Sequence, residues 1–432
     1  MATADIQRTI DAVWRMESAR IIAKLARMTR ELGSAEELAQ DALVAALEHW
    51  PKDGIPDNPG AWLMATAKNR ALDALRQRKL HDARHQELGQ DMQPLGALVT
   101  PDFVDSLDDD IGDDLLRLIF TACHPVLPAA ARTALTLRVL GGLGTDEIAR
   151  AFLLPEPTVA QRIVRAKRAL AEARVPFEVP RADQLPARLA SVLEVIYLIF
   201  NEGYAATAGE QWTRPALCEE ALRLGRILAG LAPLEPEVHG LAALMEIQAS
   251  RLRARVGPQG QAVLLADQNR GRWDQLLIGR GLAALERAQA LAATRDGLGP
   301  YALQAAIAAC HARARSAGET DWARIAALYD ALSALMPSPV VELNRAVALA
   351  MAFGPAAGLD LVDTLSAEPA LKNYHLLPGV RGDLLAKLGR FTEAGAEFTR
   401  AATLTRNLRE RELLLERAAA CTRQSTKTLL AA

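Results

Sequence analysis

Aromatic residues are scarce in this sequence, at 4% of 432 residues, and their scarcity argues against a fold built on β-strands. Alanine, leucine and arginine recur throughout, which favours helices. Half of the residues are hydrophobic, enough to build packed cores, so a globally disordered chain is excluded. We therefore predict an all-α protein, and the length predicts two to four domains.

Cysteine and an excess of either charge are also lacking. The four cysteines are far apart in sequence and form no CxxC pair, so neither a disulfide framework nor a zinc cluster is expected. Reduced thiols fit a cytosolic protein. The net charge is only −2, and any nucleic-acid surface must therefore be local rather than spread over the whole chain.

Long apolar runs are absent as well. The first ten residues, MATADIQRTI, show no signal-peptide pattern, and the longest apolar stretch, Val192 to Phe200, is interrupted by Glu194. That stretch is far too short to span a bilayer. We expect a soluble, cytoplasmic protein with no membrane partner.

Enzyme signatures are missing too, since the sequence contains no HExxH, GxSxG or GxxxxGK[ST] motif. His124 follows Cys123 and His311 follows Cys310, but neighbours on a helix point about 100° apart and cannot easily hold one metal ion. We therefore expect no catalytic residue, no metal and no cofactor. An active site within residues 186–330 remains the enzyme alternative.

Residues 143–172 have the pattern of two short helices joined by a tight turn. Thr145 can start the first helix, Pro155 and Pro157 end it, and Thr158 can cap the second with Gln161 at the capping-box position. Within the second helix an apolar stripe is predicted to face inward: Val159, Ile163, Ala166 and Leu170. Its basic residues point mostly elsewhere: Arg162, Arg165, Lys167 and Arg168. This is a helix-turn-helix pattern, whose second helix can enter the DNA major groove; an ordinary helical hairpin with a solvated basic face is the alternative.

A second basic helix is predicted from Pro59, capped by Asn58, to about residue 80. The segment from Trp62 to His85 holds six basic residues: Lys68, Arg70, Arg76, Arg78, Lys79 and Arg84. Asn69, Asp73 and Arg76 share one helix face, where amide, carboxylate and guanidinium groups can contact bases and phosphates together. Trp62 can stack on an unpaired base, or it is simply a core residue.

A third helix, residues 34–49, has Ser34 as its expected N-cap. Its small and apolar side chains can pack inward: Leu38, Ala42, Ala45 and Ala46. Its other face is acidic and polar: Glu36, Glu37, Gln40 and Asp41. That face can dock on a basic protein surface, or it is merely solvated.

Beyond residue 80 the pattern changes twice. Residues 82–112 lack a sustained apolar period, and seven aspartates lie between residues 102 and 114, as expected of a solvated linker. A three-proline break at residues 175–186 precedes a second helical region. There Arg345 and Arg381 begin similar segments 36 residues apart, with Gly354 and Gly389 at matching turn positions, a spacing similar to tetratricopeptide repeats.

Together, and in this order, the three N-terminal segments resemble the extracytoplasmic-function sigma factors of the sigma-70 family. The run from Asn58 to Arg76 resembles the helix that melts and reads the minus-ten element, and residues 145–172 resemble the minus-thirty-five reader. The resemblance implies sigma region 2 in residues 1–81, an acidic linker in 82–112 and region 4 in 113–176. It implies core RNA polymerase and promoter DNA as partners, with no catalysis by this chain. The polymerase contacts would be the β′ clamp helices and the β flap.

The resemblance also implies roles for single residues. The polymerase-binding set is Glu36, Glu37, Gln40 and Asp41. The minus-ten set is Trp62, Lys68, Asn69, Arg70, Asp73, Arg76, Arg78 and Lys79. The minus-thirty-five set is Thr158, Gln161, Arg162, Arg165, Lys167 and Arg168. Two departures from the family stand in the turn, where Leu153 occupies the usual glycine position and prolines replace the commoner serine and glycine.

The remaining chain resembles the C-terminal extension of one subgroup of these factors. It divides into a helical part, residues 186–295, and tetratricopeptide-like repeats, residues 296–425, which can bind a protein or peptide and regulate or support activity. Asn201, Glu202 and Asp274 fit packing and capping better than a ligand site. A helix-turn-helix regulator that works without polymerase, with the repeats as a sensor, is the alternative function.

Overall fold

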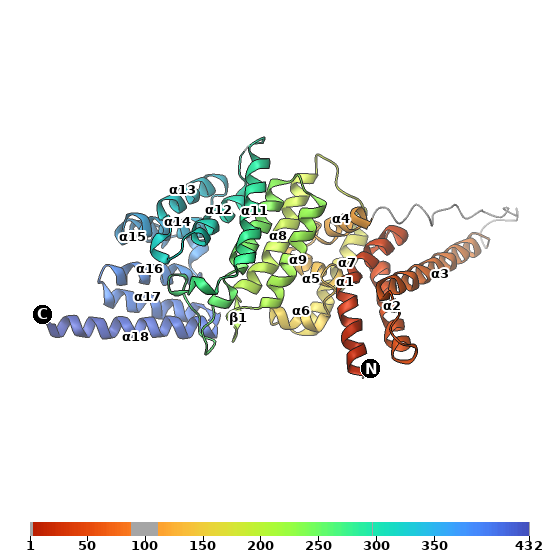
Figure 1. The fold of residues 1–432 in the computed structure, drawn as a ribbon, viewed down its shortest axis with the longest axis horizontal. Helices are drawn as coiled ribbons and strands as arrows, with labels where there is room; N and C mark the ends of the chain where they lie inside the picture. Colours follow the sequence, from red (N-terminus) through yellow and green to blue (C-terminus); the bar gives the residue numbers. More distant parts are fainter. Residues whose placement is uncertain (1–2, 88–110, 296, 432) are drawn as a thin grey trace. The chain divides into compact units, whose positions relative to one another are not determined.

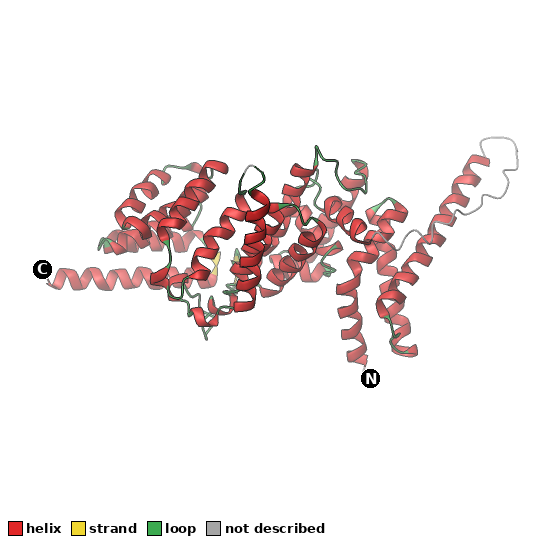
Figure 2. Ribbon diagram, turned by 45° about the horizontal axis from the view of Figure 1, so that its top comes forward, coloured by secondary structure: helices red, strands yellow, loops and turns green. Residues whose placement is uncertain are grey.

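The computed structural model describes residues 3–87, 111–295 and 297–431, and helices dominate all three stretches (Figures 1 and 2). In these stretches eighteen α-helices accompany a few 3₁₀ turns and one pair of two-residue strands. The predicted all-α class is confirmed. Most of the acidic linker, residues 88–110, lies outside the described residues.

The chain divides into two compact units, residues 1–196 and 197–432. The division falls inside helix α8 (Leu185–Tyr204), ten residues beyond the three-proline break. Each unit therefore begins or ends on the same continuous helix.

The first three helices pack against one another around α1. They are α1 (Thr3–Thr29), α2 (Leu32–Asp53) and α3 (Pro59–Glu87). The expected start of α3 is confirmed, because the side-chain oxygen of Asn58 accepts a hydrogen bond of 3.1 Å from the Ala61 N–H. The expected cap of α2 is wrong. That helix begins two residues earlier, and Ser34 instead donates to Glu31.

The next four helices follow the linker: α4 (Ile111–Ala122), α5 (Ala129–Val139), α6 (Thr145–Phe152) and α7 (Glu156–Glu172). The N-terminal half of α8 is anchored to this group. Arg188 donates to the Phe120 carbonyl at 2.7 Å, and Ser191 donates to the Cys123 carbonyl at 2.6 Å. Both carbonyls lie at the C-terminal end of α4, where helix carbonyls lack partners within the helix.

The second unit continues α8 with α9 (Pro215–Leu231), α10 (Pro236–Ala249), α11 (Gln275–Ala292) and α12 (Pro300–Arg313). Helix α10 packs against the other three of these, and Gly240 allows α12 to approach closely, since a Cβ there would lie 2.6 Å from the Ala302 nitrogen. Helix α10 is therefore the centre of this part of the fold.

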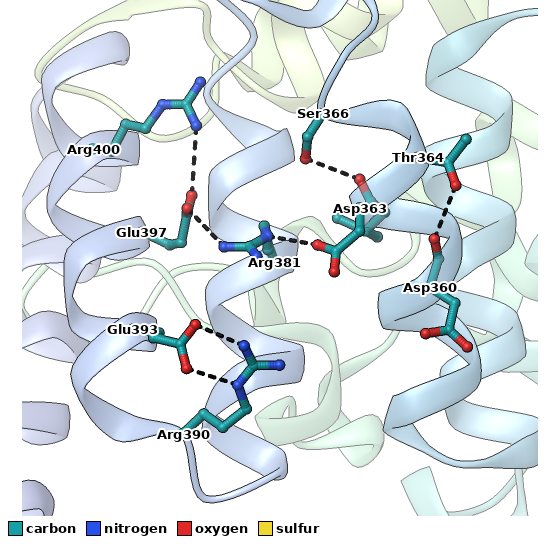
Figure 3. A network of polar contacts seen from close by, with 10 residues as sticks. Asp360, Asp363, Thr364, Ser366, Arg381, Arg390, Glu393, Glu397 and Arg400 are labelled. Atoms are coloured by element: carbon teal, nitrogen blue, oxygen red, sulfur yellow. Dashed lines mark hydrogen bonds and ion pairs between the residues drawn. The ribbon is translucent and has the colours of Figure 1, made fainter.

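Six further helices complete the unit, each packing on the next along the chain. They are α13 (Trp322–Leu335), α14 (Pro339–Phe353), α15 (Pro355–Leu365), α16 (Leu376–Lys387), α17 (Phe391–Leu404) and α18 (Leu408–Ala431). Gly354 and Gly389 both adopt positive φ, 101° and 77°, at the turns α14–α15 and α16–α17. Arg381 joins neighbouring helices by binding Asp363 at 2.8 Å and Glu397 at 3.0 Å (Figure 3).

The last helix of the unit is tied back to its beginning by a short parallel pairing. Strand β1 (Ala208–Gly209) pairs with β2 (Arg406–Asn407), and the Asn407 amide donates to the carbonyls of Ala206 and Gln211 at 2.9 Å each. Asn407 is fully buried. This contact joins segments about 200 residues apart, so the repeats and the α8–α12 group form one body.

Candidate nucleic-acid interface

Helices α6 and α7 form the predicted helix-turn-helix. Helix α6 ends at Phe152, and Leu153 takes the left-handed conformation, with φ 51° and ψ 45°, which a glycine would adopt without strain. The Leu154 N–H bonds the Ala149 carbonyl at 3.0 Å and closes the turn. The turn thus keeps the usual backbone geometry, with leucine in the glycine position.

Helix α7 buries its predicted stripe and exposes most of its polar residues. Val159, Ile163, Ala166 and Leu170 are buried, as expected. Gln161, Arg165 and Arg168 are exposed, and Arg162 is half-buried. Thr158 was expected to cap the helix, but Pro155 stands at the N-cap and Thr158 lies in the first turn, exposed. It therefore belongs to the exposed N-terminal end of α7.

Helix α3 presents the predicted polar face. Asn69, Asp73 and Arg76 are all exposed, and Arg76 binds Asp73 at 3.2 Å. Lys68 and Arg70 are half-buried. Arg78 and Lys79 were also predicted here, but their side chains lie outside the described residues.

Trp62 lies at the edge of the core. Its ring packs edge-to-face on the fully buried Trp50, with centroids 5.5 Å apart. Because Trp62 itself is only half-buried, one part of its ring packs on α2 and another part reaches solvent. The geometry is compatible with both roles that the sequence left open.

The polar face of α2 lies beside this helix. Glu37 and Asp41 are exposed, Gln40 is half-buried, and Asp41 lies 3.6 Å from Arg70 of α3. The Asp41 side chain is exposed and that of Arg70 is partly exposed, so the pair is screened by solvent and contributes little to stability. It does place the predicted polymerase-binding and DNA-binding faces next to each other.

Two residues of the predicted interfaces bind each other in this conformation. Glu36 was expected on the exposed face of α2, but it is buried, and its carboxylate binds Arg138 of α5 at 2.7 Å and Lys167 of α7 at 2.9 Å. Burial alone would raise the pKa of Glu36, yet the hydrogen bonds and charges of Lys167 and Arg138 lower it. The exposed position predicted for Glu36 is therefore wrong, while Lys167 is half-buried and bound to Glu36 in this conformation.

Further ion pairs join the two groups of helices. Asp114 of α4 is buried beside Arg27 of α1, at 3.5 Å, and beside Arg117 of its own helix, at 2.7 Å. Arg15 of α1 binds Glu147 of α6. Helices α1 and α2 therefore contact α4 to α7 through several charge pairs, of which those of Glu36 and Asp114 are the most buried. This contact was not predicted from the sequence.

Two polar residues of the second unit, Asp274 and Glu202, serve the fold. Asp274 caps α11 by accepting from the N–H groups of Leu276 and Leu277. Glu202 binds Arg214 and Thr207. These contacts agree with the capping and packing roles expected from the sequence. Among the described residues, no group of three His, Cys, Asp or Glu side chains is arranged to hold a metal ion.

Comparison with known families assigns the N-terminal segments. Residues 14–81 match Sigma-70 region 2, residues 117–170 match Sigma-70 region 4, and residues 188–289 match a family of unknown function, DUF6596. A protein with these two regions in this order is of the sigma-70 class. The first match covers most of the helix bundle α1–α3, the second runs from α4 to α7 and includes the helix-turn-helix, and the third runs from α8 to α11.

Individual relatives extend the assignment. The chain is 44% identical over 388 residues to "Uncharacterized protein R00370" of Rhizobium meliloti, covering 89% of both chains. It is 28% identical over 174 residues to "Probable ECF RNA polymerase sigma factor SigI" of Mycobacterium tuberculosis, covering 40% of this chain and 58% of that protein. The chain belongs to the extracytoplasmic-function sigma factors, with a C-terminal extension. Its partners are accordingly core RNA polymerase and promoter DNA, and its matched sigma regions are not enzyme families.

Proposed function

We propose that this protein is an alternative sigma factor of the cytoplasm whose α2 face binds core polymerase while α3 and α7 read the two promoter elements. The observation that carries the proposal is the pairing of two separate, exposed polar helix faces, on α3 and α7, with the two sigma-70 region matches. Catalysis stays with the polymerase, and the chain itself supplies recognition and DNA opening.

The polymerase contact is assigned to Glu37, Gln40 and Asp41. Their side chains form the acidic and polar part of α2 that stays accessible when Glu36 is buried. An acidic face suits a basic partner surface, which steers association and fixes register. Region 4, residues 113–176, would meet the β flap separately.

The minus-ten contact is assigned to the exposed face of α3 with its flanking basic residues. Asn69 and Arg76 supply groups that can bond bases and phosphates, and Trp62 can stack on a base with the part of its ring that reaches solvent. The minus-thirty-five contact is assigned to the N-terminal part of α7, in the set Thr158, Gln161, Arg162, Arg165 and Arg168. A recognition helix enters the major groove by that end.

The described conformation supports a closed free state. Because α2 and α7 are bound together through Glu36, the two promoter-reading helices are held at one spacing before polymerase binds. Promoter engagement would then require that contact to open. The C-terminal unit is proposed to regulate or support this step, with its helical repeats as a protein- or peptide-binding surface.

Run-off transcription from fragmented genomic DNA with core polymerase tests the proposal. We expect specific transcripts with the full-length protein, and weaker core binding for Asp41→Asn. A matched control is Asp183→Asn, which removes the same charge from an exposed residue between α7 and α8. Specific DNA binding with no association with core polymerase at low salt would reject the proposal in favour of a polymerase-independent regulator.

A further inference from the structure

The second unit contains a cluster of arginines and aromatic rings that no sigma-factor role explains. Arg251 and Arg255 flank a short 3₁₀ helix, η2 (Leu252–Ala254), directly after α10, and Arg270 begins another, η4 (Arg270–Arg272). The loops are held in place because the Asp274 N–H bonds the Ser250 carbonyl at 2.9 Å. The three arginines are therefore fixed by backbone contacts at the end of α10.

Aromatic rings separate the guanidinium groups. That of Arg255 lies 3.8 Å from the centre of the Tyr204 ring and 5.5 Å from that of Trp212. That of Arg251 lies 5.7 Å from both Tyr204 and Trp273. Arg270 lies 4.9 Å from Trp273. Cations and rings thus alternate along the cluster, a geometry in which ring faces attract the cations.

No carboxylate of the described residues forms an ion pair with these charges, although the negative charge of Glu319 acts on Arg270 and raises its pKa against the effect of burial. Within the described residues, none of the three arginines makes an ion pair, and burial lowers the pKa of Arg255 and of Arg270 with a further contribution from Arg251. Arg270 is already occupied, since it donates to the carbonyls of His311 and Ala314 and to Thr320. Arg251 donates to the Tyr204 hydroxyl. Arg251 and Arg255 are half-buried, so part of each side chain reaches solvent.

The cluster also has more hydrogen-bond donors than acceptors. Buried N–H groups without a partner include the Nε atoms of Arg251 and Arg255 and the indole nitrogens of Trp212 and Trp273. Trp273 is 4% exposed. Unpartnered buried donors are costly, and here they accompany several uncompensated positive charges. What the cluster lacks is an acceptor that carries negative charge.

We propose that this cluster, formed by Arg251 and Arg255 with the Tyr204, Trp212 and Trp273 rings, binds the phosphate group of a small molecule. The charges of Arg251 and Arg255 have no ion-pair partner among the described residues, so a doubly charged phosphate compensates them better than one carboxylate, and the guanidinium fork matches phosphate oxygens. The rings offer flat faces beside the anion. The site gives the C-terminal unit a small-molecule ligand, independently of the polymerase and DNA contacts.

Calorimetric titration of the full-length protein at constant ionic strength tests the site. The probes are inorganic phosphate and phenyl phosphate, with acetate as the carboxylate control. We expect saturable binding of phosphate by about 10 mM, the range of weak specific binding, and a higher unfolding temperature in its presence. Tighter binding of phenyl phosphate would identify a ligand in which a ring accompanies the phosphate, and equal binding of both probes would identify the phosphate group alone.

The variant Arg255→Gln should weaken phosphate binding about ten- to hundredfold, as expected for a lost charged hydrogen bond. Arg253→Gln is the matched control, because Arg253 lies on η2 between the two arginines and is exposed. The Arg253→Gln variant should bind phosphate with the affinity of the wild type. Arg255→Lys keeps the charge but not the fork, so it should bind with intermediate affinity and serves if the glutamine variant does not fold.

Three results would overturn the site: no saturation with either phosphate probe, acetate binding as tight as phosphate, or equal losses in Arg255→Gln and Arg253→Gln. In each case the arginines and rings would be a stacking arrangement that only stabilises the fold. Transcription is not needed for this readout, so its outcome is separate from that of the proposed function.

Discussion

Replacing Glu36 by glutamine should release α7 from α2. The glutamine keeps the size of the side chain but removes the charge that binds Arg138 and Lys167. Both cations would then face an uncharged amide in a buried setting. We expect the closed arrangement of α1–α3 against α4–α7 to loosen while each helix group keeps its own core.

The magnitude follows from burial. Removing one partner of a buried ion pair costs about 3–5 kcal/mol, because the remaining charge is left without compensation. The Glu36 side chain is 4% exposed, but those of Arg138 and Lys167 are 23% and 20% exposed and can partly rehydrate. We therefore place the loss at the lower end, about 3 kcal/mol, which is roughly a hundredfold shift of the equilibrium toward the open arrangement.

Distances between spin labels on α3 and α7 provide the measurement. Glu37→Gln is the control, since it makes the same change at the next residue, which is exposed. The distance distribution should broaden and lengthen for Glu36→Gln and stay unchanged for Glu37→Gln. Duplex binding without polymerase should rise only for Glu36→Gln.

An unchanged distance distribution for Glu36→Gln would refute the reasoning, as would equal behaviour of the two variants.

The dependence of the closed arrangement on pH offers a second check. Because the folded pKa of Glu36 lies below its ordinary value of 4.5, its contribution is complete above that value and is lost as the pH falls through the lowered pKa. The closed arrangement should therefore open in acid in the wild type and show less of this dependence in Glu36→Gln.

Three further outcomes are expected. Leu153→Gly should raise the free energy of unfolding, measured in urea, by about 1 kcal/mol. Glycine adopts left-handed φ without strain, and Leu153 is 52% exposed, so little burial is lost. A free energy of unfolding below that of the wild type would show that Leu153 is not strained. Burial, together with the charges of Arg251 and Arg270, lowers the pKa of His311 from 6.5 to about 4. The free energy of unfolding should therefore fall by about 3 kcal/mol as the pH drops from 6.5 to about 4. The variant His311→Gln should show a smaller dependence of this free energy on pH. Arg165→Ala should weaken upstream-element binding by about 1–3 kcal/mol if the contact is bidentate, and a footprint unchanged at that element would remove the assignment.

The helix-turn-helix could be predicted from the sequence because its signals are local. The apolar spacing from Val159 to Leu170 defines the buried face of α7, and Asn58 before Pro59 defines the start of α3. Two of the predicted caps were wrong. Ser34 and Thr158 have the right residue type, but α2 and α7 begin two residues before them, since a helix can extend past a good cap when tertiary packing favours it.

The buried position of Glu36 could not be predicted in the same way. On α2 alone, Glu36 belongs to the same polar group as Glu37 and Gln40, and only the approach of α5 and α7 turns it into a buried ion-pair residue. Its partners lie 102 and 131 residues away in sequence. The arginine and aromatic cluster of the second unit was missed for a related reason, because Tyr204, Arg255 and Trp273 come from three separate segments.

The contacts of α2 suggest how polymerase binding and opening are coupled under the proposed function. The Gln40 side chain donates to Glu36 at 2.6 Å, so a proposed polymerase-binding residue is bonded directly to the carboxylate that holds Arg138 and Lys167. One residue further, Asp41 pairs with Arg70 of α3. A partner that binds Gln40 and Asp41 therefore affects both promoter-reading helices. It removes the Gln40 hydrogen bond from Glu36, which binds α7. It also removes Asp41 from its ion pair with Arg70 of α3. Polymerase thus need not contact the buried ion pairs directly, because binding to adjacent groups on the same helix shifts the equilibrium from the closed arrangement toward the open one.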